Sequence, residues 1–419
     1  MKVNFKYAMM TIAALTMGLT SCSNDNEVVD TQNEETQNLS IRIAQPEMSR
    51  AVAGPEANKA NPVVFSDGEL LLCNASGKIL DVYAFSSTLA TDLSLNRIAI
   101  GDAIATNGVT ITNVDGDVRS AYIVGNSGAI KTVDNIGYSA VAKKGEYISS
   151  VKAYTVTPVM QYNATNKDLA NVTLWGEGTL VPDPSVAPTD PAKKYVEITL
   201  RPHVARLEIA DVTAVPNTTG VSITQYDVKG IYINKYYPTL SLDARTPAAI
   251  VNSGQGGTTV YGDNQGVYAS ALKGILYDYS TTYFGNTTTT ALTKYPNGTN
   301  NVDVWAYNLL AAPVIAGDAV LATATTLAPQ VIVEVENVQA SNSQSYANMR
   351  YITVGKLIDA TTSTTITHFE AGKIYTIDPG SFEFDVDGVK DDANVGKIDL
   401  RVKVSLITWT TVGMKPEIQ

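Results

Sequence analysis

Alternation of apolar and polar residues with a period of two is the feature that most constrains the fold of this chain. Successive side chains of a strand point to opposite faces, so such runs are typical of strands with one buried and one wet face. Tyrosine and β-branched residues, which pack well on pleated surfaces, are abundant, and long amphipathic helical patterns are scarce. The sequence therefore predicts an all-β fold. The clearest alternating segments are 196–200 (VEITL), 205–209 (ARLEI), 382–386 (FEFDV, running into Asp387-Gly388, a hairpin-type dipeptide) and 400–406 (LRVKVSL).

A proline-rich stretch divides the chain. Residues 182–191 hold four prolines, and because proline donates no backbone hydrogen bond, no central strand can run there. Roughly 370 residues follow residue 50, which is enough for two domains of ordinary size. The simplest architecture is two β-sandwich domains in series, at residues 51–190 and 191–406. Residues 252–266 and 285–301 are rich in Gly, Asn and Thr and are expected to be surface loops.

The N-terminus has the features of an export signal. Lys2 and Lys6 precede an uncharged apolar run at residues 8–19, which is too short to span a bilayer as a helix. The sequence Leu-Thr-Ser-Cys ending at Cys22 resembles the bacterial lipobox, in which the cysteine is diacylated and becomes the first mature residue. Residues 1–21 are thus expected to be a lipoprotein signal peptide, with an ordinary signal and a chance cysteine as the alternative. The polar, acidic residues 23–38 are expected to be a tether, and they resemble segments that send lipoproteins to the outer face of the outer membrane.

Composition argues against several functions. The net charge of −11 disfavours nucleic-acid binding, which needs a basic stripe, and no later segment is apolar enough to span a membrane. Cys73 is the one cysteine after Cys22, so no internal disulfide can form in the rest of the chain. His203 and His368 are the only histidines, and neither has the neighbours of a metal site, so surface or core histidines are expected. No catalytic motif is found, and we expect neither enzyme activity nor a cofactor.

Two Asp-rich segments are the nearest approach to a ligand site. Asp385, Asp387, Asp391 and Asp392 could supply oxygens to calcium, but their spacing fails the EF-hand pattern. Residues 113–117 (NVDGD) are similar. Hairpin turns account for both segments, because Asp and Gly are the residues that such turns require.

Four features taken together resemble the Bacteroidales fimbrillins, or type V pilins, of the short-fimbria (minor fimbrium) kind. The resemblance spans nearly the whole chain, and its most specific feature is the segment 200–209. The features are the lipobox at Cys22, the segment Leu39-Ser40-Ile41-Arg42-Ile43 followed by Met48-Ser49-Arg50-Ala51, the segment 200–209 (LRPHVARLEI), and Gly372-Lys373-Ile374-Tyr375 before a final strand and Trp409.

The resemblance implies a mechanism of assembly. In that family a lipoprotein precursor reaches the outer membrane and cell surface, where a trypsin-like protease cuts after an arginine and releases the first strand. The groove is then filled by the C-terminal segment of a neighbouring subunit, so two transthyretin-like β-sandwich domains are completed by donor-strand exchange. For this chain the implied partners are other copies of itself and related fimbrial subunits, with a lipid anchor on the precursor. The implied role is that of a structural subunit supporting adhesion, biofilm formation or colonisation.

The sequence contains both strands that this mechanism needs. Residues 22–50 would be a lipidated propeptide whose removable strand has Leu39, Ile41 and Ile43 on one face. Residues 407–419 would be the donor segment, in which the alternation changes phase after Leu406, as at a bulge or an exit from the sheet. The alternative is that 407–419 folds back on its own domain. The apolar residues of the donor segment are Ile407, Trp409, Val412, Met414 and Ile418.

Arg50 is the expected cleavage site, giving Ala51 as the new N-terminus. Small residues flank it and Pro46 ends the strand before it, which is typical of exposed segments that proteases cut. Arg42 is a weaker candidate because it lies inside the strand, and Arg50 as an ordinary surface arginine is the alternative.

Two other functions remain open from the sequence. The chain could be a monomeric surface lipoprotein that binds glycans or a host protein through tyrosines, which offer large amphipathic faces. It could also be an anchor or tip subunit of the same fibre, although the well-formed tail favours a stalk position. The tyrosines concerned are Tyr226, Tyr232, Tyr236, Tyr237, Tyr261, Tyr268, Tyr277, Tyr279 and Tyr283.

Overall fold

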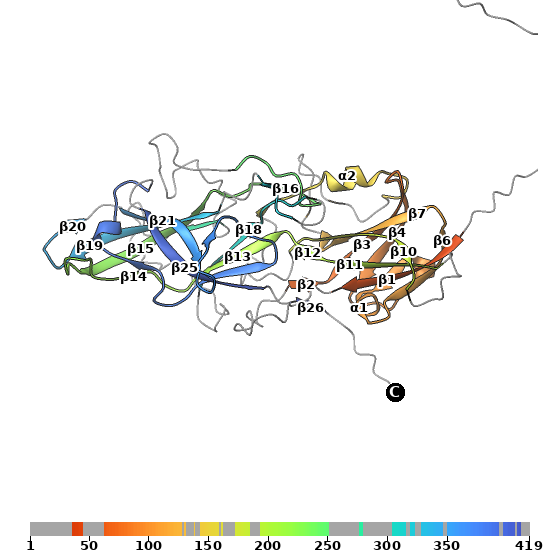
Figure 1. The fold of residues 1–419 in the computed structure, drawn as a ribbon, viewed down its shortest axis with the longest axis horizontal. Helices are drawn as coiled ribbons and strands as arrows, with labels where there is room; N and C mark the ends of the chain where they lie inside the picture. The colour runs from red at the N-terminus through yellow and green to blue at the C-terminus, as the bar shows by residue number, and fades with distance from the viewer. Residues whose placement is uncertain are drawn as a thin grey trace, which may run out of the picture. The chain divides into compact units, whose positions relative to one another are not determined.

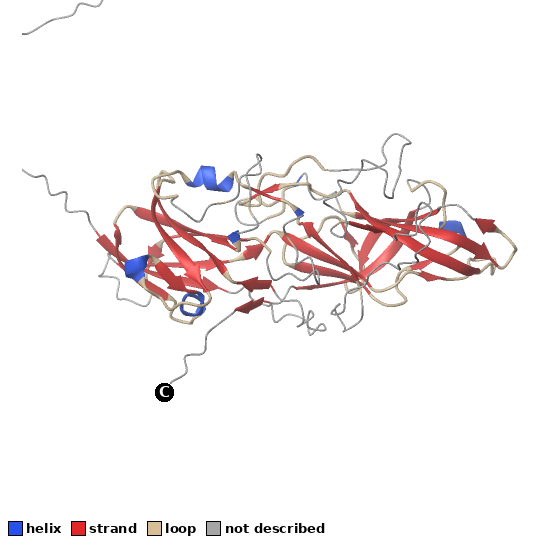
Figure 2. Cartoon of the chain, turned by 180° about the vertical axis from the view of Figure 1, so that it is seen from behind, coloured by secondary structure: helices blue, strands red, loops and turns tan. Residues whose placement is uncertain are grey.

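The structure is a computed structural model, and the residues it describes are almost entirely strands joined by turns (Figure 2). Two short α-helices occur among them, α1 (Ile100–Ile104) and α2 (Ile148–Lys152). The predicted all-β class is therefore confirmed. The described residues are 36–44, 63–127, 130, 138, 143–158, 161, 172–184, 193–250, 276–279, 304–315, 319–322, 328–346, 350–393, 397–406 and 409–411.

Two sheets are built from the first half of the chain. The first has the order β10 (Val181–Pro182), β11 (Lys193–Thr199), β1 (Thr36–Ala44), β6 (Val109–Asp115). The second has the order β12 (Arg201–Pro202), β9 (Leu174–Thr179), β7 (Val118–Gly125), β3 (Asp67–Asn74), β4 (Ile79–Ser86), β5 (Arg97–Ala99).

These two sheets pack face to face over a common core. Leu39 and Ile198 of the first sheet and Leu70 and Ile123 of the second belong to one cluster of buried residues. The sheets approach closely at Gly176 in β9, where a Cβ atom would lie 2.5 Å from a methyl group of Ile198. This is the sandwich arrangement that the alternation predicts.

The second half of the chain forms a larger sheet with its own core. Its path runs β17 (Tyr277–Tyr279), β15 (Ile223–Asn234), β19 (Gln330–Ala340), β21 (Arg350–Asp359), β25 (Lys397–Leu406), β23 (Lys373–Ile377), β13 (Val204–Ile209), β18 (Trp305–Leu310). The short strands β20 (Ser345–Tyr346) and β22 (Thr365–Ile366) pair with β19 and β21. Strand β25 pairs with β21 up to Val402 and with β23 from Lys403, so it joins the two layers around this core.

Three two-stranded pairings complete the described fold. They are β14 (Thr213–Ala214) with β24 (Glu383–Phe384), β16 (Leu240–Ser241) with β8 (Thr155–Val156), and β2 (Val63–Phe65) with β26 (Trp409–Thr411).

The chain leaves the first two sheets and enters the larger sheet at His203, between β12 and β13. Strands β11 and β12, although they follow the proline-rich stretch, pair with β1 and β9, and β13 then enters the larger sheet. The division into domains at 190 and 191 stays a prediction. The signal peptide, Cys22, Arg50, Ala51 and the two expected loops lie outside the described residues.

The expectation that every alternating segment has one wet face is wrong for β13. All six of its residues are buried, and Arg206 and Glu208 are both 0% exposed. The strand lies between β18 and β23, and the two side chains neutralise each other through a 2.7 Å hydrogen bond from Nε of Arg206 to Glu208. Alternation in the sequence thus marks two different buried environments here, one apolar and one ionic.

Three local expectations also need correction. The tether was expected to extend to residue 38, but Thr36–Asn38 belong to β1, where buried Gln37 donates hydrogen bonds to the carbonyl oxygens of Asp115 and Val118. Asp387-Gly388 lies in a 3₁₀ turn whose N-cap is Asp385, rather than in a hairpin. Gly116 and Asp117 join strands of different sheets rather than two strands of a hairpin.

Candidate functional site: the first strand and its groove

Strand β1 is an inner strand of its sheet, although it comes from the very start of the described chain. It pairs in parallel with β11, from Asn38↔Lys193 to Ala44↔Thr199, and antiparallel with β6, ending at Ile41↔Val109. Figure 1 shows β1 beside β11. Because hydrogen bonds are made along both edges, loss of β1 would leave two unpaired strand edges facing each other.

The inner face of β1 is apolar and buried, as the sequence predicts for the removable strand. Leu39, Ile41 and Ile43 are 0%, 1% and 3% exposed and belong to the core between the two sheets. Burying such side chains contributes about 1.5–3 kcal/mol each, or roughly 5–9 kcal/mol together. The groove that β1 fills therefore needs three apolar side chains at alternate positions.

The outer face of β1 makes specific polar contacts. Nη1 of Arg42 lies 3.2 Å from Oε2 of Glu197, its direct partner on β11. The same carboxylate oxygen accepts a 2.6 Å hydrogen bond from the hydroxyl of Tyr195. The hydroxyls of Ser40 and Thr110 are 3.2 Å apart on the β6 side. These contacts distinguish the two edges of the groove, because Arg42 meets a carboxylate on the β11 edge and Ser40 meets a hydroxyl on the β6 edge.

Gly108, just before β6, is required by the close approach of β1. Its φ is +60°, and a Cβ atom there would lie 2.2 Å from the carbonyl oxygen of Ile41. Glycine alone satisfies both the positive φ and the short distance. The contact also shows that the Ile41 carbonyl points toward the β6 edge.

The C-terminal end of the chain returns to the first half. After β25 ends at Leu406, β26 (Trp409–Thr411) pairs in parallel with β2, whose Val63 and Phe65 are buried in the first core. These three residues thus pair within the chain, but with a strand of the first half rather than with one between residues 191 and 406, and the fold-back alternative stays open for 407–419. Ile407, Val412, Met414 and Ile418 lie outside the described residues, as does the side chain of Trp409.

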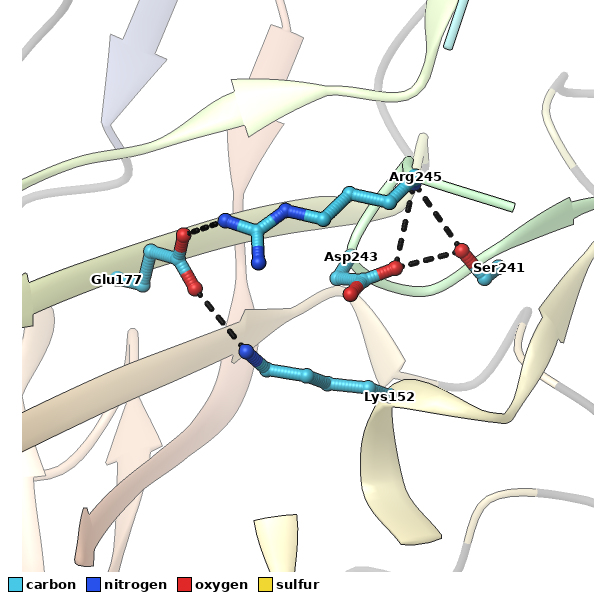
Figure 3. Close-up of polar contacts among 5 residues, drawn as sticks. All are labelled: Lys152, Glu177, Ser241, Asp243 and Arg245. Carbon is cyan, nitrogen blue, oxygen red and sulfur yellow. Dashed lines mark hydrogen bonds and ion pairs between the residues drawn. The ribbon is translucent and has the colours of Figure 1, made fainter. Parts of the chain in front are cut away.

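A second group of interacting side chains, which no pattern in the sequence indicated, lies where β16 meets β8: Lys152, Glu177, Ser241, Asp243 and Arg245. Glu177 on β9 pairs with both Lys152 and Arg245, with 3.3 Å between Oε2 and the Lys152 Nζ atom (Figure 3). Asp243 accepts hydrogen bonds from the Ser241 hydroxyl at 2.6 Å and the Arg245 backbone N–H at 3.2 Å. This clasp joins residues far apart in sequence, so no local motif could have indicated it.

A cavity of about 600 Å³ adjoins the clasp, and Trp175, Tyr122 and Arg201 are among its lining residues. Nζ of Lys152 lies 4.8 Å from the centre of the Tyr122 ring and 5.8 Å from that of Trp175. The cation thus covers the aromatic floor while its charge is balanced by Glu177. The arrangement is suited to holding β16 against β9.

His203 is a core histidine, one of the two roles expected of it. Its backbone N–H donates to the carbonyl oxygen of Thr173, its Nε2 lies 2.7 Å from the carbonyl oxygen of Leu242, and its backbone carbonyl accepts from Ala311. Burial lowers the pKa of the imidazole below 6.5. Its Nδ1 also lies 3.2 Å from the carbonyl oxygen of Thr173, so the residue connects three segments through its backbone and both ring nitrogens.

Other candidate groups show no arrangement for chemistry. No cluster of three metal-ligating side chains occurs among the described residues, and none of their helices is long and apolar enough to cross a membrane. Tyr232, Tyr236 and Tyr237 are buried, so they do not form an exposed recognition face. Tyr261, Tyr268 and Tyr283 lie outside the described residues, as do the side chains of Tyr277 and Tyr279.

Comparison with known proteins identifies the fold. No protein family model and no curated protein matches the chain. Among solved structures, it is similar to a fimbrilin (FimA) of Porphyromonas gingivalis W83, with 10% identity and a TM-score of 0.50 over 91% of this chain and 99% of that one. A candidate cell adhesion protein of Parabacteroides distasonis gives 10% identity and 0.48 over 91% and 99%, and one of Bacteroides eggerthii gives 14% and 0.44 over 91% and 98%. The chain has a fimbrillin-like fold.

Proposed function

We propose that this chain is a structural subunit of a cell-surface fimbrium, exported as a lipoprotein and polymerised by strand exchange. The observation that carries the proposal is the position of β1, an inner strand with three buried apolar side chains that lies within the first 44 residues. The fimbrillin-like fold and the lipobox at Cys22 support the same role.

In the proposed pathway Cys22 is lipidated and places the precursor on the outer face of the outer membrane. Cleavage after Arg50 cuts the chain six residues beyond the end of β1 at Ala44. The cut leaves β1 held only by its hydrogen bonds and its buried face, so it can now be displaced. The lipid then departs with β1, and the anchor is temporary.

The open groove is a template for another strand. Strand addition supplies backbone hydrogen bonds along both edges, and alternate side chains fill the apolar positions. The proposed donor is the C-terminal segment 407–419 of a second copy or of a related subunit. Trp409–Thr411, which pair with β2 in the single chain, would leave β2 and pass to the neighbouring subunit.

The proposal is tested by cleaving the full chain with an arginine-specific protease and following polymer formation by electron microscopy and by gel ladders. The wild type should form polymers after cleavage. A variant lacking residues 407–419 should be cleaved and remain folded but stay monomeric, and Arg50→Ala should stay uncleaved at this position and monomeric. Polymer formation by the deletion variant would overturn the proposal.

A further inference from the structure

We infer that the donor segment enters the groove parallel to β11 in one register, with Lys415 taking the place of Arg42 opposite Glu197 of the neighbouring copy. This inference rests on the proposed function and specifies its partner contact. Residues 412–416 (VGMKP) would then replace residues 39–43 (LSIRI) position by position.

The apolar pattern agrees with this register. Val412 and Met414 would fill the buried positions that Leu39 and Ile41 occupy in the single chain. Gly413, between them, would lie on the outer face at the position of Ser40, where a small residue stands now. Side-chain size and polarity therefore alternate in the order that the groove requires.

The charge pattern agrees as well. Departure of β1 removes Arg42 from Glu197. The Glu197 carboxylate then keeps its 2.6 Å hydrogen bond from the Tyr195 hydroxyl but loses its cation. Lys415 is the one cation of the donor segment 407–419, and in this register it directly faces Glu197. An opposite charge facing across two strands is favourable, and a like charge is unfavourable.

The proline decides the register most sharply. Pro416 would occupy the position of Ile43, and its missing N–H matters only if that position makes a ladder bond. The Ile41 carbonyl points toward Gly108 on the β6 edge, and backbone groups two residues apart in a strand point to the same edge. Pairing with β6 ends at Ile41, so the Ile43 position makes no ladder bond there and tolerates proline.

A parallel register in which residues 414–418 replace 39–43 fails on both counts. It would place Pro416 at the position of Ile41, which pairs with Val109, and would set Glu417 against Glu197. An antiparallel entry that fills the same positions would place Pro416 at the position of Leu39, which is paired on both edges, and Gly413 opposite Glu197. Each alternative loses a ladder bond and leaves the carboxylate without its cation.

Three cysteine pairs distinguish these registers in the full chain. Each variant combines Glu197→Cys with Gly413→Cys, Lys415→Cys or Glu417→Cys, and polymers formed after cleavage are treated with a short thiol crosslinker. All three tail positions share the outer face, so accessibility is matched, and native Cys73 is buried. Neighbouring strands lie about 4.8 Å apart, so only the pair that is directly opposite should crosslink efficiently.

We expect the 197–415 pair to crosslink between subunits at least several-fold more than the other two. Dominant crosslinking of the 197–413 or 197–417 pair, or of none in polymers that do form, would overturn the register while leaving strand exchange in place. If the cleaved wild type forms no polymers, the proposed function fails first.

As a second readout, Lys415→Glu should slow polymerisation roughly two- to fivefold at low salt, and adding Glu197→Lys should restore it. A swap that does not restore the rate would contradict the contact.

Discussion

Arg42 and Glu197 face each other across the parallel pair of β1 and β11, with 3.2 Å between Nη1 and Oε2. The two residues are 155 positions apart in sequence, and the arginine belongs to the strand that the proposed cleavage releases. Both side chains are about 40% exposed, so the pair contributes at most about 1 kcal/mol to stability. In the proposed exchange, this pair marks the position at which the replacing strand would place its own cation.

Truncation of the inner face of β1 should weaken the hold of the strand on the groove. Ile41→Ala removes buried methyl groups and should lower the free energy of unfolding by about 2–5 kcal/mol. Ser40→Ala, on the outer face of the same strand, should change it by about 0.5 kcal/mol or less. Urea unfolding of the two variants would check this, and equal effects would show that β1 is not held by its apolar face.

Gly108→Ala should loosen β1 although no residue of β1 itself is changed. The added Cβ would clash with the Ile41 carbonyl, so β1 should be displaced more readily after cleavage and polymers should form faster. Gly145→Ala is the matched control, because Gly145 has a φ of +90° but nothing within 4 Å of the added atom. Equal rates for the two variants would mean that the clash does not control release of the strand.

Acid should destabilise the chain through His203. Burial lowers the pKa of its imidazole in the folded state below 6.5, so the unfolded state binds the proton more tightly. The stability of the chain with the neutral His203 ring is therefore fully present above pH 6.5, and it is lost progressively as the pH falls below that value. His203→Gln should flatten the pH profile of unfolding between pH 5 and 7. Burial also lowers the pKa of His368, but this side chain is only partly buried, so His368→Gln should have a smaller effect. An unchanged profile in His203→Gln would contradict the assignment.

Glu334 should act in the opposite direction. Burial raises the pKa of its carboxyl to about 7, against the lowering effect of the Tyr232 hydroxyl that donates to it at 3.0 Å. The folded state therefore binds the proton more tightly, and stability falls as the pH rises from about 4.5 through 7. Glu334→Gln should stabilise the chain at pH 8 by up to about 3 kcal/mol and have little effect at pH 4. Thermal unfolding at the two pH values would check this, and a destabilised variant at pH 8 would contradict it.

The strands and the inner face of β1 could be predicted from the sequence because burial of one face imposes a period of two. Leu39, Ile41 and Ile43 are buried in the structure, as Val196 and Ile198 are on its neighbour β11. The same rule failed at Arg206 and Glu208, since a strand covered on both faces can pair charges internally and still alternate in sequence.

What the sequence could not predict were contacts between distant segments. The parallel pairing of β1 with β11, the ion pair of Arg245 with Glu177 and the pairing of β26 with β2 each join residues more than 60 positions apart. No local propensity encodes such partners, because they are decided by how whole sheets pack. The roles of Gly108 and His203 could not be predicted either, because they depend on atoms supplied by segments distant in sequence.

In the proposed assembly β1 leaves the chain and the C-terminal segment of another copy replaces it, which can be tested by sequencing the N-terminus of chains within assembled polymers. These chains should begin at Ala51, with β1 absent from the polymer. Polymers built from chains that begin at lipidated Cys22 and retain Leu39, Ile41 and Ile43 would contradict it.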